Sequence, residues 1–311
     1  MKKALIIIIC VVGIILGGCA ASYYFFPGII VKSFFIYNRL SAGLSRHEIK
    51  VDDHQWAYFE GGTGDVIVFL HGFGDSKEGW GAFPAPFMDS YRVIIPDLPG
   101  FGENSRVLSD SYRVPDQAKR LDRFVETIGL RSFHLCGESL GGTIAAYYAT
   151  VYPDKVKSIM VMGSPGLRQA AKTDAMRAYE KDKTEGLYYK TEKGFHQLMG
   201  WAFAKPPQFP RPFVDYFVET ARERYSFNKK MFDDLYKTDF TIMENRLLKI
   251  TAPVLIIWGN NDRIIHISTG EAYHKGIKNS RLEILNGGHM IYADEPEKTI
   301  KVYRDFLKNL K

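Results

Sequence analysis

The chain has 311 residues, of which 46% are hydrophobic and 24% charged, and its net charge at pH 7 is +6. This length suffices for one large α/β domain or two small domains, and the composition excludes disordered and collagen-like proteins. Residues 1–50 carry six Lys or Arg side chains against one Glu, which accounts for +5 of the +6. A basic excess beside an apolar N-terminus indicates attraction to a membrane surface and not a nucleic-acid partner.

The N-terminal segment allows three interpretations. Lys2 and Lys3 precede an almost unbroken apolar run over residues 4–21. This run is nearly long enough to span a bilayer, and the aromatic residues that follow it resemble an interfacial belt, so we expect a transmembrane anchor at residues 1–26. The alternatives are a lipoprotein attached through Cys19, which ends a lipobox-like Leu-Gly-Gly-Cys, and a cleaved signal that exports a soluble protein.

Residues 27–46 are predicted to form an interfacial amphipathic linker, because apolar residues alternate there with Lys32, Asn38 and Arg39. The folded domain is expected to occupy residues 47–311. Alternating apolar residues predict an edge hairpin, and short continuous apolar runs predict buried strands. The hairpin strands are expected at 47–51 and 55–59, and the buried strands at 66–70, 91–95, 133–138, 156–162, 253–258 and 281–285.

Helical patterns separate several of these strands, at 114–130, after Ser139 and from Pro296 to the end. Such alternation predicts an α/β fold with a mostly parallel, doubly wound sheet. Residues from about 167 to 248 lack a parallel-strand run and are rich in large aromatic residues. We therefore expect a helical cap inserted over the carboxyl edge of the sheet, with most of its aromatic side chains holding the cap together.

The segment Gly137-Glu138-Ser139-Leu140-Gly141 has the pattern G-x-S-x-G between an apolar run and a helix-forming run. This pattern is typical of a nucleophile elbow, a sharp strand-to-helix turn that exposes a serine at the top of a sheet. Glycines flank the serine because the turn brings backbones too close for Cβ atoms. Ser139 is thus the candidate nucleophile.

A serine hydroxyl needs a base within hydrogen-bond reach and an acid that orients the base. Asp262 follows the next-to-last predicted strand, and His289 follows the last one. Reacting groups in open α/β sheets gather outside the carboxyl ends of the strands. The chain order Ser, Asp, His therefore predicts that Ser139, Asp262 and His289 form a catalytic triad.

The backbone amides of Leu140 and Phe73 are the expected oxyanion donors, since one residue follows the nucleophile and the other lies in the loop after the third strand. Three other polar residues near these loops are interpreted as structural. His71 would hold its loop, and Asp97 would fix its loop through backbone amides. Glu138 is interpreted in the same way, with tuning of the site as the alternative.

These motifs together resemble the α/β-hydrolase superfamily: His-Gly-Phe-Gly at 71–74, Asp-x-Pro-Gly-x-Gly at 97–102, Gly-Glu-Ser-Leu-Gly-Gly at 137–142, Trp-Gly-x-x-Asp at 258–262 and Gly-His at 288–289. The whole chain resembles membrane-anchored monoacylglycerol lipases and related bacterial serine esterases and lipases, including the Phe-Phe-Pro-Gly after the anchor. The resemblance implies the same triad and oxyanion donors. Many relatives have Met at position 140, which leaves the chemistry unchanged because that position acts through its backbone.

We therefore expect a serine carboxylic-ester hydrolase that cleaves monoacylglycerols or similar lipid esters through an acyl-enzyme on Ser139. A carbon–carbon bond hydrolase of the same fold and a non-catalytic, membrane-tethered binding module remain alternatives. No metal or organic cofactor is implied, since no Cys/His cluster has zinc-like spacing. The expected partners are the lipid ester and membrane lipid, and the sequence indicates neither nucleic-acid binding nor an obligate protein partner.

Overall fold

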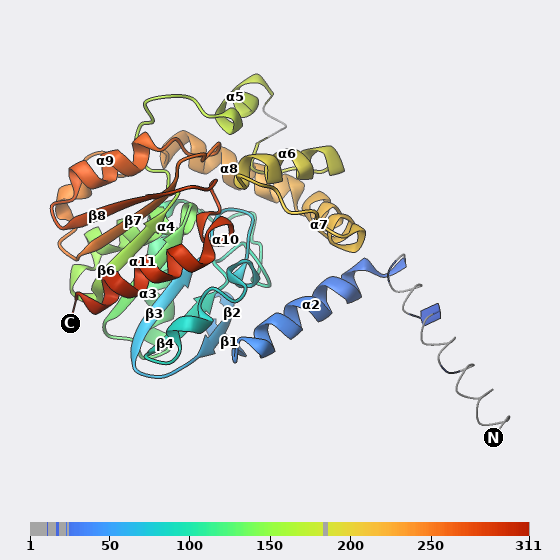
Figure 1. The fold of residues 1–311 in the computed structure, drawn as a ribbon, viewed down its shortest axis with the longest axis horizontal. Helices are drawn as coiled ribbons and strands as arrows, with labels where there is room; N and C mark the ends of the chain where they lie inside the picture. Colours follow the sequence, from blue (N-terminus) through green and yellow to red (C-terminus); the bar gives the residue numbers. More distant parts are fainter. Residues whose placement is uncertain (1–10, 12–16, 19–22, 24, 183–185, 311) are drawn as a thin grey trace.

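An eight-stranded sheet forms the centre of the molecule, with the strand order β1-β2-β4-β3-β5-β6-β7-β8. The structure is a computed structural model that describes residues 11, 17, 18, 23, 25–182 and 186–310. The first two strands are antiparallel to each other and β2 is antiparallel to β4, whereas all pairs from β4 to β8 are parallel. The predicted mostly parallel α/β sheet is therefore confirmed (Figure 1).

The strands are β1 (Ser45–Val51), β2 (His54–Gly61), β3 (Asp65–Leu70), β4 (Tyr91–Pro96), β5 (Phe133–Glu138), β6 (Val156–Met162), β7 (Val254–Gly259) and β8 (Ser280–Leu285). The helices are α2 (Pro27–Ser41), α3 (Val114–Thr127), α4 (Leu140–Val151), α5 (Asp174–Lys181), α6 (Glu192–Ala202), α7 (Arg211–Glu223), α8 (Tyr225–Thr238), α9 (Ser268–Gly276), α10 (Ile291–Asp294) and α11 (Pro296–Lys308). Each predicted strand is present within a few residues of its expected bounds. The sequence reasoning missed α9 and α10.

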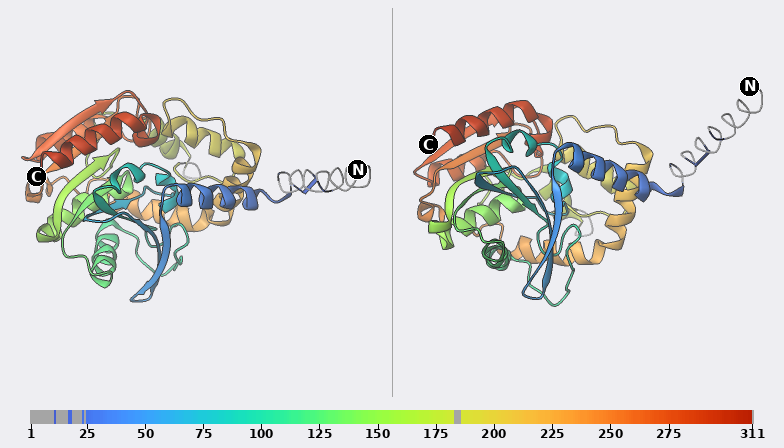
Figure 2. Two further views of the ribbon diagram at one scale, coloured as in Figure 1. Left: turned by 60° about the horizontal axis from the view of Figure 1, so that its bottom comes forward. Right: turned by 90° about the horizontal axis from the view of Figure 1, so that it is seen from below.

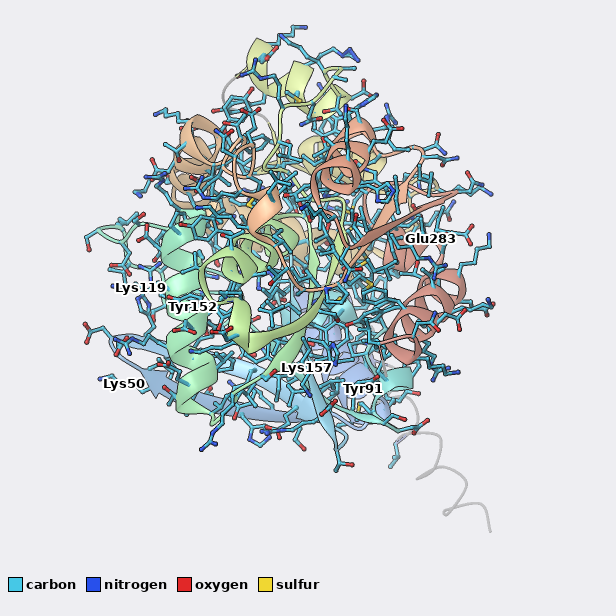
Figure 3. All side chains as sticks on the ribbon, turned by 90° about the vertical axis from the view of Figure 1, so that its left-hand side faces the viewer. Lys50, Tyr91, Lys119, Tyr152, Lys157 and Glu283 are labelled. Atoms are coloured by element: carbon cyan, nitrogen blue, oxygen red, sulfur yellow. The ribbon has the colours of Figure 1, made fainter. Side chains whose placement is uncertain are left out.

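The central strands separate two hydrophobic cores, because successive side chains point to opposite faces of a sheet. In β3, Val68 and Leu70 belong to the core under α3, α4 and α9. Ile67 and Phe69 belong to the core on the other face, under α11 and the loop after β3. This burial on both faces explains why the strands have continuous apolar sequences. Figure 2 shows the helices on both sides of the sheet. Figure 3 shows charged side chains at the surface of the molecule, such as Lys119 of α3 and Lys157 of β6.

Four helices, α5 to α8, lie between β6 and β7 in the sequence and cover one end of the sheet (Figure 1). Aromatic side chains join these helices. Tyr179, Tyr188 and Phe232 form one buried cluster, and Phe195 packs with Val214 and Val218 in another. Most cap aromatics therefore pack against one another, as expected from the sequence.

Helix α2 lies against the cap helix α7, far from it in the sequence (Figures 1 and 2). The ring of Phe34 meets that of Phe213 edge to face, with 5.1 Å between their centroids. Val31 is fully buried, whereas Phe26, Ile29 and other apolar side chains of this segment are exposed. The sequence did not predict this contact, because it depends on the position of α7.

Among the residues that the structure describes, no helix is both long and apolar enough to cross a bilayer. The anchor predicted at residues 1–26 and the alternative attachment site Cys19 fall almost entirely outside the described residues.

Candidate active site

Ser139 occupies the turn between β5 and α4, with φ of 51° and ψ of −119°. A positive φ is uncommon for a residue with a Cβ and costs roughly 1–3 kcal/mol when the surroundings enforce it. Here its backbone N–H donates to Met162 O at 2.8 Å. Gly141 is required nearby, since a Cβ at that position would lie 2.6 Å from His71 O. The turn therefore has the strained geometry that the G-x-S-x-G pattern predicted.

Asp262 and His289 meet at the carboxyl ends of β7 and β8. His289 Nδ1 lies 2.8 Å from Asp262 Oδ2, and both side chains are buried. The other carboxylate oxygen, Oδ1, accepts hydrogen bonds of 2.8 Å from the backbone amides of Ile264 and Ile265. These bonds fix the carboxylate, so Nδ1 is the imidazole nitrogen that donates to it and Nε2 is left to face the rest of the site.

The nitrogen Nε2 of His289 faces Glu138, the residue before Ser139. Glu138 Oε1 lies 3.2 Å from Nε2, and the carboxyl is 2% exposed. Among the described residues, no hydrogen bond joins Ser139 Oγ to His289, and Glu138 Oε1 also has no hydrogen-bond partner. Catalytic hydrogen bonds are often loose without substrate. Sequence reasoning interpreted Glu138 as structural; its position beside the nucleophile was the only signal of this contact.

The two carboxylates change the protonation of His289. Burial disfavours the imidazolium, but the charge of Asp262, its hydrogen bond to Nδ1 and the charge of Glu138 together raise the pKa of His289 to about 9. Burial raises the pKa of Glu138 to about 8, although His289 lowers it. The protonation of the imidazole and that of the Glu138 carboxyl are therefore coupled.

A narrow apolar cavity adjoins Ser139. Its volume is about 30 Å³. The sheet side contributes Phe73, Val114, Ser139, Leu140, Thr143, Pro165 and Ile265, and the cap side contributes Leu187, Phe232, Leu235, Asp239 and Phe240. Both predicted oxyanion residues line it. Leu140 is the first residue of α4, so its amide has no acceptor within that helix.

The loops after β3 and β4 are held together by buried polar groups. Asp97 is fully buried and accepts 2.8 Å hydrogen bonds from the backbone amides of Lys77 and Glu103 and from Lys77 Nζ. His71 Nε2 accepts a hydrogen bond from Leu98 N at 3.0 Å. The structural roles predicted for Asp97 and His71 are therefore confirmed. The buried ammonium of Lys77 was not anticipated.

The cap is hydrogen-bonded to the loops that carry Asp262 and His289. Met290 N, next to His289, donates to Ala202 O at the end of α6, at 2.9 Å. Thr173 Oγ1, which precedes α5, donates to Ile264 O at 2.8 Å. The segments before α5 and at the end of α6 are therefore hydrogen-bonded to the Asp262 and His289 loops.

Comparison with known proteins agrees with this geometry. Residues 65–296 match the family model of the alpha/beta hydrolase fold. The chain belongs to the α/β-hydrolase fold family. The crystal structure of a membrane phospholipase A, described as a bacterial virulence factor, is 33% identical, with a TM-score of 0.88, and the match covers 100% of this chain and 99% of that one.

Curated relatives of this hydrolase include lipases. The human monoacylglycerol lipase ABHD6 is 27% identical over 300 residues, or 91% of this chain and 88% of the human protein. Lipase 3 of Moraxella sp. (strain TA144) is 27% identical over 251 residues, or 80% and 79% of the two chains. The predicted resemblance to monoacylglycerol lipases and bacterial lipases is therefore confirmed.

Proposed function

We propose that the protein is a serine hydrolase that cleaves carboxylic esters of lipids through an acyl-enzyme on Ser139. The observation that carries this proposal is the strained turn at Ser139, beside a buried Asp262–His289 pair at 2.8 Å and an apolar cavity. A structural or binding role requires neither the strain nor the buried pair.

In the proposed reaction, Ser139 Oγ attacks the ester carbonyl carbon while His289 Nε2 takes its proton. The carbonyl oxygen becomes an oxyanion, and the backbone amides of Phe73 and Leu140 donate to it. His289 then gives the proton to the leaving alcohol, and an acyl-enzyme remains. A water molecule then attacks the acyl carbon while His289 Nε2 takes its proton. The bond to Ser139 Oγ breaks as His289 returns this proton to Oγ, and the fatty acid is released. In both steps Asp262 keeps Nδ1 protonated and stabilises the imidazolium.

The substrate class follows from the lining of the cavity. Phe232, Leu235 and Phe240 from the cap face the site, and such a surface favours an acyl chain over a polar group. The volume of about 30 Å³ is roughly a tenth of the smallest ordinary ligand pocket. We therefore expect the cap to move away from the sheet when a lipid ester binds. The lipase names of the relatives support a monoacylglycerol or a similar ester.

We also propose that the protein resides at a membrane through its N-terminal segment. The apolar run over residues 4–21 and the exposed Phe25, Phe26 and Ile29 support this location. A relative that is 33% identical is described as a membrane phospholipase, which is consistent with this location. After lysis, the full chain should sediment with membranes and stay there in alkaline carbonate. Release by carbonate would refute an integral anchor.

The principal test compares the full-length wild type with Ser139→Ala on monoacylglycerols of increasing acyl length in detergent micelles. We expect loss of at least 10³-fold in kcat in the variant, together with a preference for longer chains. A fluorophosphonate probe should label the wild type and not Ser139→Ala.

Other outcomes would favour the alternatives. Serine-dependent activity confined to short soluble esters would limit the function to a general esterase. Inactivity of both proteins on every ester, without probe labelling, would refute the proposal and favour a binding module. Serine-dependent cleavage of a carbon–carbon bond next to a ketone, without ester cleavage, would favour the other hydrolase reaction.

A further inference from the structure

The contact between Glu138 and His289 places a second carboxylate on the candidate base. Asp262 Oδ2 lies 2.8 Å from Nδ1, and Glu138 Oε1 lies 3.2 Å from Nε2, so that the ring is held between two buried acids. Within the described part of the chain, Glu138 Oε1 forms no hydrogen bond. An unpartnered polar atom at this depth is costly unless it interacts with charge. Its nearest charge is the imidazole.

The groups around this pair are mostly acidic or neutral. Asp262 and Asp75 raise the pKa of Glu138, while His289 and the backbone amide of Gly72 lower it. Tyr292 of α10 and Cys136 of β5 lie within range of the same charge. His289 is therefore the cation in this set, and its charged form is the one that satisfies the carboxylates.

We propose that Glu138 is a positioning residue that holds His289 as an imidazolium between two carboxylates and thereby sets the pH at which Ser139 becomes nucleophilic. The inference rests on the proposed function, since it concerns the base that would activate Ser139. Nε2 must lose its proton before it can accept the proton of Ser139 Oγ. A carboxylate 3.2 Å away opposes that loss.

The same carboxylate has the opposite effect after the attack. The imidazolium that forms when Ser139 gives up its proton is stabilised by Glu138 as well as by Asp262. Once its carboxyl is ionised, Glu138 thus lowers the fraction of enzyme with a free Nε2, and it favours the charged intermediate after the attack. No merely structural role predicts both effects.

Loss of the Glu138 charge should change the pH dependence of kcat/KM in a defined direction. The negative charge of Glu138 raises the pKa of His289, so its removal leaves more of the enzyme with a free Nε2 below about pH 9. In Glu138→Gln we expect the acid limb of kcat/KM to move to lower pH by about one unit or more. A shift of one unit corresponds to about tenfold weaker stabilisation of the imidazolium. In Glu138→Gln, the alkaline plateau of kcat/KM should fall by up to about tenfold, so the pH profiles of the variant and the wild type cross.

The experiment measures kcat/KM between about pH 5 and pH 10 for the full-length wild type, Glu138→Gln and Glu78→Gln. Glu78 is a matched control, because burial raises its pKa as well, to about 7. The charges that act on it are those of Lys77, Asp97, Glu103 and Arg39, so its removal should leave His289 unaffected. In parallel, the imidazole of His289 is titrated by NMR in ¹⁵N-histidine-labelled protein. This titration needs no substrate.

The expected result is a lower His289 pKa and crossing profiles in Glu138→Gln, with Glu78→Gln following the wild type. An unchanged His289 titration in a folded Glu138→Gln would overturn the inference, whether or not the protein cleaves esters. Inactivity of the wild type on all esters would refute the proposed function and leave the titration to decide the role of Glu138. Should Glu138→Gln fail to fold, Glu138→Leu, which is also uncharged, replaces it in both measurements.

Discussion

The carboxyl edge of the sheet and the cap above it are stabilised by different interactions. At the sheet edge, buried charged groups such as Lys77, Asp97 and Asp262 are fixed by hydrogen bonds of 2.8 Å to backbone and side-chain partners. In the cap, aromatic rings pack against one another, as in the contact of Tyr179 with Phe232 at 5.0 Å. Hydrogen bonds fix atomic positions, whereas ring packing tolerates rearrangement. We therefore expect the edge to carry the chemistry and the cap to control substrate access.

The largest effect is expected at the edge. In Asp262→Asn the amide can no longer hold Nδ1–H of His289, so the wrong tautomer forms, and kcat on a lipid ester should fall by about 10⁴-fold. Steady-state kinetics measures this loss. Asp234→Asn, which removes an exposed cap carboxylate paired with Lys230, serves as the control and should retain wild-type kcat. A loss below tenfold in Asp262→Asn would show that the acid lies elsewhere.

Stability should depend most on the buried ion pair beneath the loops. Lys77→Met leaves the fully buried Asp97 without its counter-charge and should lower the free energy of unfolding by about 3–5 kcal/mol. The exposed pair of Lys157 and Asp65 is the matched control, and Lys157→Met should cost about 1 kcal/mol or less. Urea unfolding at pH 7 compares the two. Equal losses of unfolding free energy in the two variants would mean that the contribution of the Lys77–Asp97 pair does not depend on its burial.

Selectivity for the acyl chain should depend on the cap. Leu187→Trp enlarges a cap side chain that lines the cavity, and it should reduce kcat/KM for long-chain monoacylglycerols by roughly tenfold or more while changing that for short esters little. The exposed Leu248 provides the control variant, Leu248→Trp. An equal loss for all chain lengths would indicate that the cavity does not receive the acyl chain.

The smallest effect is expected where α2 meets the cap. A double-mutant cycle with Phe34→Ala and Phe213→Ala should give a coupling free energy of about 0.5–1.5 kcal/mol, because the two rings meet edge to face at 5.1 Å. Urea unfolding of the four proteins provides the values. A coupling of zero would mean that α2 leaves α7 in solution, and the attachment of α2 to the cap would then be in doubt.

The sequence predicted the sheet well for a physical reason. Strands such as β3 and β7 are buried on both faces, so their apolar runs are unmistakable, and their carboxyl ends meet at one edge in any parallel sheet. The same rule predicted that Asp262 and His289 lie at the same edge of the sheet. The elbow was recognisable because only glycine fits at positions 137 and 141, two residues before and after Ser139.

Other features were decided by the tertiary structure alone. The contact of Glu138 with His289 depends on how the loops after β5 and β8 face each other, and no spacing in the sequence encodes that distance. The pairing of Lys77 with Asp97 and the docking of α2 on α7 are also contacts between distant segments. Local sequence thus determined the strands, the turn and the candidate nucleophile. Packing determined which buried charges meet, and these contacts shift the pKa of the candidate base, His289.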